Sequence, residues 1–376
     1  MTKRIWLMLF LVLAGEAGVY AQEDLPLVNT QSVSLEGLDM LSINYGSDEV
    51  ILRESETSDL IIKEYMKIDR PRYYADVSRS AGGVTVRRGQ RPWLNWTWKA
   101  RAEIYLPGSF RENLRIFNSS GNLRAETDLL DYKTIDINLG SGFISLGRIS
   151  ALTLSIRVSS GEADVRSAGG NSFISLSSGK LQIRELSGSE HRLKTSSGRM
   201  RIDAIQGASV IEVSSGAVVI EKLGGNADIE IKSGDLHITE LTGTAHRFKS
   251  SSGRTTMETV RGRIEGDISS GSLSIKRFSD EGSFKVNSGD VILDMEELIG
   301  DLRFHLSSGR VILNIPREFP FNLDAVTRSG WISVTDTGNE ETRVSGNSTV
   351  LRPFGPSPER TIYAQTSSGT VTINRR

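Results

Sequence analysis

The chain of 376 residues contains no cysteine, which removes several kinds of structure and chemistry at once. It can have no disulfide framework, no thiolate ligand for a metal ion and no cysteine nucleophile. Proline is scarce, with 9 residues, and the formal net charge is only −1. A chain this close to neutral lacks the concentrated basic surface that binds nucleic acid. We therefore expect no nucleic-acid partner, and no motif calls for a cofactor or a metal.

Long apolar runs are also rare, and the first lies at the start of the chain. Lys3 and Arg4 precede an apolar run over residues 5–15, and residues 19–21 (Val-Tyr-Ala) resemble a cleavage site. This order is typical of a secretory signal peptide, and the run is too short to cross a bilayer. Residues 1–21 are therefore predicted to be a signal peptide, with an uncleaved anchor as the alternative. The remaining chain is predicted to be exported, without a transmembrane segment, to the periplasm or the cell surface.

Glycine, in contrast, is abundant, with 37 residues, and many of them recur at a regular interval. A Ser-Gly step, usually preceded by a second serine, returns every 18 to 21 residues until a final interval of 39, about two periods. The glycines of these steps are Gly121, Gly142, Gly161, Gly179, Gly198, Gly216, Gly234, Gly253, Gly271, Gly289, Gly309, Gly330 and Gly369. Such a regular interval is typical of a repeat architecture.

The residues around these glycines alternate between apolar and polar side chains. Apolar residues stand two and four places after the glycine, as Leu181 and Ile183 do after Gly179, with polar residues between them. This alternation predicts a strand with one buried face. A second glycine often follows nine places after the first. Each unit therefore predicts two short strands and two glycine turns, and it is too small to fold alone.

Two arrangements of the units fit this pattern. In a parallel β-solenoid, or single-stranded β-helix, equivalent strands of successive coils pair, whereas in a meander each glycine turn reverses the chain within one sheet. The return of the same residue class at fixed offsets favours the solenoid, because equivalent positions then lie above one another. Glycine suits the corners because it accepts positive φ and leaves no side chain against the next coil. The preceding serines can bond corner backbone groups. The predicted fold class is an all-β parallel solenoid with coils of about 18–19 residues.

The regular repeat covers only part of the chain. Residues 111–335 are predicted to form the regular Ser-Gly solenoid, preceded by irregular N-terminal β coils over residues 22–110. Residues 336–376 are predicted to form a C-terminal loop, or a hairpin, and a closing coil, because prolines interrupt the repeat there. Irregular capping coils are expected because an open solenoid end is an unpaired sheet edge.

The repeat resembles that of a known family. Three features carry the resemblance: the Ser-Ser-Gly units with alternating apolar residues, the segment 102–107 (Ala-Glu-Ile-Tyr-Leu-Pro) before the first unit, and the closing segment 366–373. They are similar to those of bacterial exported, adhesin-like proteins of unknown function with repeated β-strands. The resemblance covers most of the predicted mature chain. It implies a β-solenoid at the cell envelope, with no established enzymatic activity and no shared catalytic residues.

A cluster of tryptophans is the strongest candidate for a binding site. Trp93, Trp96 and Trp98 lie within six residues and are flanked by basic residues, among them Arg91 and Lys99. Indole faces stack on sugar rings, and basic flanks suit acidic glycans or phosphate headgroups. The alternative is structural, with the rings closing the open end of the solenoid as a cap. The sequence favours the cap and leaves both interpretations open.

Other candidates for chemistry are weaker. His191 and His246 stand in matching contexts and would share one column three coils apart, too far for two ligands of one metal ion. Both are predicted to be solvated surface residues. Asp294, Glu296 and Glu297 form a tight acidic group that is predicted to be a solvated turn.

The residues directly after the repeat glycines are predicted to form one outward column. Opposite charges would be neighbours in this column at Asp235 and Arg254 and at Asp290 and Arg310. Such cross-strand pairs support a sheet by up to about 1 kcal/mol each. Because the column has no single sign of charge, neither DNA nor an anionic membrane is favoured as a partner.

These patterns predict a non-enzymatic exported β-solenoid that acts as an adhesin-like binding or structural module at the bacterial cell envelope. An envelope glycan or another surface protein is the expected partner. Two alternatives remain. The first is a scaffold that assembles end to end, and the second, with less support, is a glycan lyase or hydrolase. An enzyme would need carboxylate and basic side chains clustered on one face, which the columns do not provide.

Overall fold

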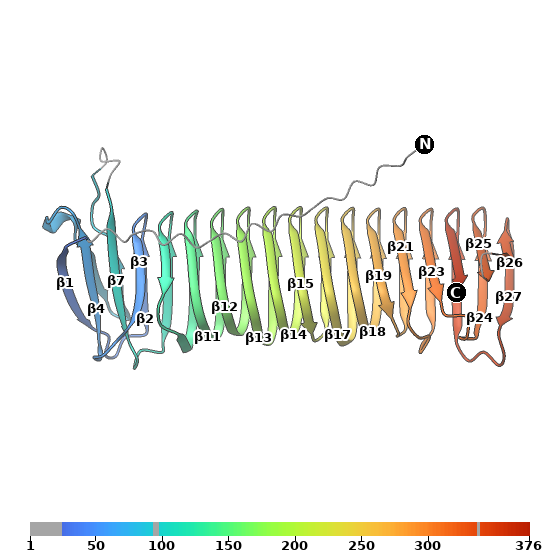
Figure 1. Ribbon diagram of the computed structural model, residues 1–376, viewed down its shortest axis with the longest axis horizontal. Helices are drawn as coiled ribbons and strands as arrows, with labels where there is room; N and C mark the ends of the chain where they lie inside the picture. The colour runs from blue at the N-terminus through green and yellow to red at the C-terminus, as the bar shows by residue number, and fades with distance from the viewer. Residues whose placement is uncertain (1–24, 93–97, 337–338) are drawn as a thin grey trace, which may run out of the picture.

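The structure of the protein, a computed structural model, describes residues 25–92, 98–336 and 339–376. It is a parallel β-solenoid, as predicted, whose coils stand side by side in a long rod (Figure 1). The described residues form 29 strands in one hydrogen-bonded system and one 3-10 helix, η1 (Pro71–Tyr73). Within these ranges no helix combines the length and the apolar character needed to span a membrane. The predicted signal peptide, residues 1–21, lies outside the described residues.

Each coil of the regular rod contains one long bent strand or two shorter ones. The strands are β8 (Asn113–Asn118), β9 (Asn122–Ala125), β10 (Leu129–Leu139), β11 (Phe143–Val158), β12 (Glu162–Leu176), β13 (Lys180–Thr195), β14 (Arg199–Val213), β15 (Ala217–Gly224), β16 (Ala227–Ile231), β17 (Asp235–Ser250), β18 (Arg254–Ile268), β19 (Ser272–Phe278), β20 (Gly282–Val286), β21 (Asp290–Met295), β22 (Leu302–Leu306) and β23 (Arg310–Ile315). Strand β12, for example, runs through a whole coil. Strands β15 and β16 together form the coil that follows those of β13 and β14.

Strand β12 shows how the alternation builds the core. Ala163 and Val165 point inward and are buried. Glu162, before Ala163, and Asp164, between the two, face outward. The neighbouring β13 pairs with β12 in parallel, so that Ala163 lies opposite Leu181. The repeated register stacks inward side chains on their counterparts and forms one hydrophobic core along the rod. Burying each large aliphatic side chain contributes roughly 1.5–3 kcal/mol, so stacking supplies the stability that a single coil lacks.

Glycine occupies the Ser-Ser-Gly corner because of the neighbouring coil and not because of its backbone angles. Gly198 has no positive φ, but a Cβ atom there would lie 2.6 Å from the carbonyl oxygen of Gly179 and 2.7 Å from the Leu176 side chain. The prediction of positive φ is therefore wrong at this corner. It is confirmed at the second corner, where Gly207 has a φ of 128° and Gly262 one of 108°.

The N-terminal end is an irregular cap. Its strands are β1 (Leu27–Ser34), β2 (Met40–Tyr45), β3 (Glu49–Ser55), β4 (Asp59–Met66), β5 (Asp76–Ser80), β6 (Gly83–Arg87) and β7 (Ala100–Pro107). Strands β2 and β3 form a parallel coil that lies between β6 and β7 on one side and β8 and β9 on the other. Strands β1, β4 and β5 pair antiparallel with their neighbours, so the predicted cap is present but part of it is a meander.

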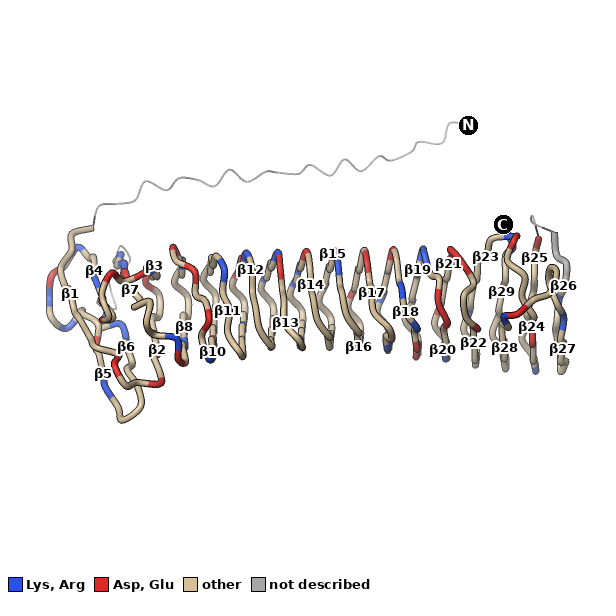
Figure 2. Tube along the Cα trace, turned by 90° about the horizontal axis from the view of Figure 1, so that it is seen from below, with Lys and Arg blue, Asp and Glu red and all other residues tan. Residues whose placement is uncertain are grey.

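The C-terminal end also departs from the regular stack. Its strands are β24 (Phe321–Thr327), β25 (Trp331–Asp336), β26 (Asn339–Ser345), β27 (Ser348–Phe354), β28 (Thr361–Thr366) and β29 (Thr370–Arg375). Strands β26 and β27 pair antiparallel with β25 and β24 and cover the last coil. Strands β28 and β29 are the last in the chain, yet they lie between β22 and β23 on one side and β24 and β25 on the other (Figure 2). The repeat spacing does not predict this order.

Replacing Gly198 by alanine is expected to destabilise the rod. The new Cβ atom would meet the backbone of the neighbouring coil, which can move away only by breaking the ladder, and we expect a loss of about 2 kcal/mol. Urea denaturation followed by circular dichroism measures this loss. Gly82→Ala is the matched control, because nothing lies within 4 Å of a Cβ atom there. Equal stability of the two variants would contradict the close-approach explanation.

Candidate functional site

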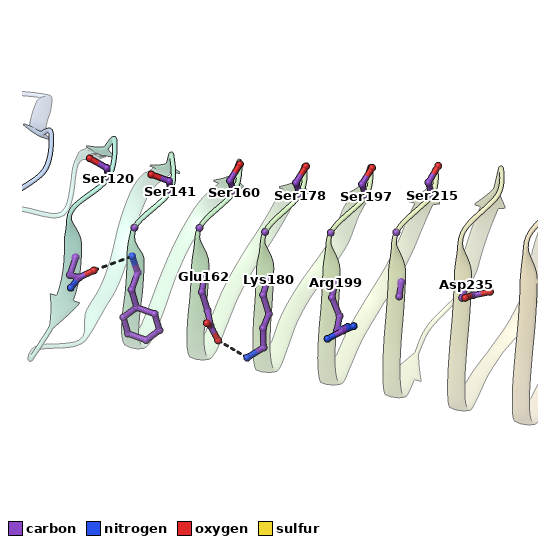
Figure 3. Close-up of a pocket in the computed structure, with 18 residues that line it drawn as sticks. Ser120, Ser141, Ser160, Glu162, Ser178, Lys180, Ser197, Arg199, Ser215 and Asp235 are labelled. Atoms are coloured by element: carbon purple, nitrogen blue, oxygen red, sulfur yellow. Dashed lines mark hydrogen bonds and ion pairs between the residues drawn. The ribbon is translucent and has the colours of Figure 1, made fainter. Parts of the chain in front are cut away.

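A groove runs along the Ser-Ser-Gly corner of the rod from Ser120 to Asp235 and has a volume of about 880 Å³. One wall is a row of serine side chains, and the other is formed by the outward residues that follow the repeat glycines (Figure 3). The serines are Ser120, Ser141, Ser160, Ser178, Ser197 and Ser215. With coils about 4.8 Å apart, the row is roughly 24 Å long.

The serine hydroxyls are available because the corner backbone is satisfied by the neighbouring coil. The Ser197 amide donates a hydrogen bond to the Ser177 carbonyl at 2.7 Å, and this pattern repeats from coil to coil. The Ser197 hydroxyl has no hydrogen-bond partner among the described residues, and that of Ser141 has only a long contact of 3.5 Å with the Ser119 carbonyl. The labelled serines point away from the rod in Figure 3. The predicted role of these serines in bonding the corner backbone is therefore wrong for the row in the groove, apart from the long contact of Ser141.

The opposite wall carries both signs of charge and one aromatic ring. Lys180 Nζ donates a hydrogen bond to Glu162 Oε1 at 2.5 Å, and Phe143 is 40% exposed beside them. Arg199, on the next coil, forms no ion pair with any residue that the structure describes. Asp235 ends the wall. The groove thus offers a row of neutral hydroxyls facing a few charged groups of either sign.

The outward column continues beyond the groove as predicted. Arg310 Nη2 and Asp290 Oδ2 form an ion pair at 3.0 Å between neighbouring strands. Asp235 and Arg254 are also neighbours in the register, but they form no ion pair within the described residues. Acidic and basic residues are interspersed along the rod in Figure 2.

Among the described residues, the groove shows neither an activated nucleophile nor a paired acid and base. No carboxylate or imidazole of the described residues is hydrogen-bonded to the serine hydroxyls of the row, so none of them activates a nucleophile. The two lining carboxylates, Glu162 and Asp235, stand four coils apart, about 19 Å, too far to act as an acid and base pair. The described residues also contain no group of three or more histidines and carboxylates that could hold a metal ion.

The two histidines of matching context are buried, and their prediction as solvated surface residues is wrong. They share one column three coils apart, as predicted, but His191 is 0% and His246 3% exposed. His191 Nε2 donates to the Gln206 carbonyl at 2.9 Å, since a carbonyl only accepts. Its Nδ1 therefore accepts a hydrogen bond from the Ser172 hydroxyl at 2.8 Å.

His246 repeats only half of this arrangement. Its Nε2 donates to the Arg261 carbonyl at 3.0 Å, but its buried Nδ1 has no hydrogen-bond partner among the described residues. The reason is one substitution between the two copies of the context: Ala227 stands where Ser172 stands before His191. Burial lowers the pKa of both imidazoles below the ordinary value of 6.5, although the carbonyl contacts oppose this shift.

The acidic group near residue 295 is only partly a solvated turn. Glu296 and Glu297 are exposed, as predicted. Asp294 is half-buried at the end of β21 and accepts a hydrogen bond from the side chain of Asn314 on the neighbouring β23. Asp294 therefore links two neighbouring coils.

Three residues of the predicted tryptophan site are described. Trp98 and Arg91 are partly buried and Lys99 is exposed, whereas Trp93 and Trp96 lie outside the described residues. A binding role for this cluster therefore stays a prediction.

The contacts of Trp98 and Arg91 lie within the N-terminal cap. Trp98 packs edge-on against Tyr73, with ring centroids 5.0 Å apart, and the Arg91 guanidinium lies 5.6 Å from the Trp98 ring centroid. Arg91 Nε donates to Asp48 Oδ2 at 3.0 Å in a buried ion pair, and Arg91 Nη1 donates to the Tyr73 carbonyl at 2.6 Å. These contacts fasten the segment after β6 to η1 and to the turn between β2 and β3.

Comparison with known proteins finds one family and several distant structures. The family described as Toastrack DUF4097 matches residues 39–221, 153–277 and 226–374. A candidate adhesin from Parabacteroides merdae is 12% identical, over 76% of this chain and 95% of that chain, with a TM-score of 0.30. From Parabacteroides distasonis, a candidate adhesin is 10% identical over 94% and 98% of the two chains, with a TM-score of 0.31. A candidate lipid-binding protein of that species is 12% identical over 92% and 96%, with a TM-score of 0.24. No curated protein matches the chain.

Ala227→Ser is expected to stabilise the protein by about 1 kcal/mol, because the new hydroxyl would donate to the unpartnered Nδ1 of His246. Ser172→Ala, in the other copy of the context, is expected to cost about the same by leaving His191 Nδ1 unpartnered. Urea denaturation of the two variants and the wild type measures both effects. Destabilisation by both substitutions would show that the serine and the histidine are not coupled.

The protein is expected to lose stability as the pH falls below about 6.5. In the unfolded chain the histidines take up protons near that pH, whereas burial lowers the pKa of His191 and His246 in the folded state. Their contribution is therefore complete above the unfolded pKa and declines on acidification, by at most about 1.4 kcal/mol per pH unit for each histidine. Denaturation midpoints between pH 5 and 8 test this. The double variant His191→Gln, His246→Gln should show a flatter profile, and an unchanged slope would refute the assignment.

Proposed function

We propose that this chain, which belongs to the Toastrack DUF4097 family, is an exported, non-enzymatic, adhesin-like binding module of the bacterial cell envelope. Its ligand, in this proposal, is a linear glycan that lies lengthwise in the corner groove. The observation that carries the proposal is the row of outward serine hydroxyls, one on each coil, that faces a wall of mixed charge. The cell-envelope location rests on the predicted signal peptide over residues 1–21.

The shape of the groove favours an extended polymer. It is open and runs along the axis, so a compact small molecule would contact only a short part of it. An extended glycan presents a new sugar at an interval close to the spacing of the coils, about 4.8 Å. Each sugar could then make the same hydrogen bonds to the next serine, and many weak contacts would add up to useful affinity.

The chemistry of the groove favours a polyhydroxylated ligand. A serine hydroxyl donates one hydrogen bond and accepts others, which matches the dual character of sugar hydroxyls. The ring of Phe143 offers an apolar face at one end, and Arg199 offers a charge that the protein itself does not neutralise among the described residues. A nucleic acid would require a wall of continuous positive charge. In this groove the acidic residues Glu162 and Asp235 interrupt the basic ones.

The absence of catalytic geometry in the described groove supports a binding function over a lyase or hydrolase. The two lining carboxylates are too far apart to cooperate, and the serines have no neighbouring base. A glycan held in this groove would therefore be retained and not cleaved.

Ser178→Trp and Ser197→Trp are each expected to weaken glycan binding at least about tenfold, because an indole would fill the groove between two coils. The ligand is first found by screening the full-length chain on an array of linear neutral and acidic polysaccharides. Affinity for the best polysaccharide is then measured by calorimetry. Arg199→Ala should weaken binding of acidic polysaccharides selectively and reduce its dependence on salt.

Ser288→Trp is the matched control, because Ser288 occupies the same corner position and makes the same backbone bond, to Ser269, outside the groove. Its affinity should equal that of the wild type. Equal loss in all three tryptophan variants, or no loss in any, would contradict the assignment of the ligand to this groove. Failure of the wild type to bind any polysaccharide on the array would contradict the glycan itself.

A further inference from the structure

The C-terminal coil, residues 361–376, fills a slot between two coils that are consecutive in the chain. Strand β28 lies between β22 and β24, and β29 lies between β23 and β25, so that the end of the chain is found inside the stack (Figure 2). All four pairings are parallel and continue the register of the rod. The coil therefore pairs with the edges of β22 and β23 on one side and with those of β24 and β25 on the other.

The core contacts of this coil are those of any other coil. Ile362, Val371 and Ile373 point inward and are 0% exposed. Gly369 continues the glycine stack of the Ser-Ser-Gly corner between Gly309 and Gly330. If the coil left the slot, these apolar side chains and the four flanking strand edges would all be exposed, and open edges of this kind bind other strands. The rod as described therefore needs a copy of the coil in the slot to keep these edges paired.

Polar contacts make the slot specific for this segment. Asn374 Nδ2 donates to Asn314 Oδ1 on one side at 2.7 Å, and Thr335 Oγ1 donates to Asn374 Oδ1 on the other side at 2.8 Å. At the end of the chain, the Arg376 amide donates to the Ile315 carbonyl at 3.0 Å. A shift of the coil by one residue would break these bonds, so they fix its register.

The hinge that leads into the coil is short and bent. Residues 355–360 connect β27, on one side of β24, to β28 on the other side. Gly355 has a φ of 86° and Ser357 a φ of 43°, and the second value is unfavourable for a residue with a side chain. An extended hinge would relieve this strain.

We propose that the C-terminal coil is exchangeable between copies of the protein, so that two rods can join by each placing residues 361–376 in the slot of the other. Every contact of the coil except the hinge is available from a second copy, which is the condition for domain swapping. The exchange in this proposal is reciprocal: each of two copies places its coil in the slot of the other, so the assembly closes as a two-fold dimer and does not continue into a fibre. The antiparallel strands β26 and β27 remain in place on the outer coil of each rod.

The first test shortens the hinge in the full-length chain. Deleting residues 356–360 leaves Gly355 alone between Phe354 and Thr361, and two Cα–Cα steps reach at most about 7 Å. The two ends lie two strand spacings apart, about 9.6 Å, so the coil can no longer enter its own slot. We expect a dimer of twice the wild-type mass by gel filtration with light scattering. Replacing residues 356–360 by five glycines and serines should leave the protein monomeric.

A monomeric short-hinge variant with wild-type melting behaviour would overturn the proposal, and so would a mixture of large oligomers. If the variant does not fold, a second measurement decides. A protease site is placed in the hinge of the otherwise unchanged full-length chain, and the cut protein is warmed with a labelled synthetic peptide of residues 361–376. The expected result is uptake of one peptide per rod, and no uptake of a peptide carrying Ile373→Asp. Absence of uptake at every temperature below melting would overturn the proposal.

Discussion

The spacing between parallel coils is the constraint on which the rest of this protein depends. Backbone hydrogen bonds hold successive coils about 4.8 Å apart, and every repeated feature is a response to that distance. At the Ser-Ser-Gly corner it leaves no room for a side chain, which is why Gly198 and its counterparts are glycines. On the flat faces it brings equivalent residues into contact, which produces the core columns within and the ion pairs outside.

The same constraint explains the groove and the buried histidines. Because the neighbouring coil satisfies the corner amides, the serine hydroxyls are left outward as a row with one member per coil. Because inward positions are enclosed by the coils on both sides, a polar group there needs a partner from an adjacent coil. Ser172 supplies one for His191, and Ala227 supplies none for His246. Stacking thus has two effects. It makes the outer surface regular, and it leaves inward polar groups dependent on adjacent coils for hydrogen-bond partners.

Much of this was predictable from residues close together in the sequence. Period-two alternation predicts the strands, and the return of each residue class predicts the parallel columns, both of which are confirmed. The error over His191 and His246 had a visible signal, since both stand an odd number of places before a repeat glycine, as the inward residues do. The serine row was equally visible in the repeat. Its outward direction depends on hydrogen bonds between coils, which no local pattern reports.

The sequence by itself determined the strands, the corners and the parallel stacking, because each follows from side-chain alternation and glycine placement within one repeat. Only the tertiary structure decided the order of the coils at the two ends, where β2 and β3, and later β28 and β29, lie between coils that follow one another in the chain. The physical reason is that all coils share one spacing and one pattern of hydrogen bonds. Backbone pairing alone therefore does not specify which coils are neighbours, and long-range side-chain contacts, such as that of Asn374 with Asn314, contribute to that choice.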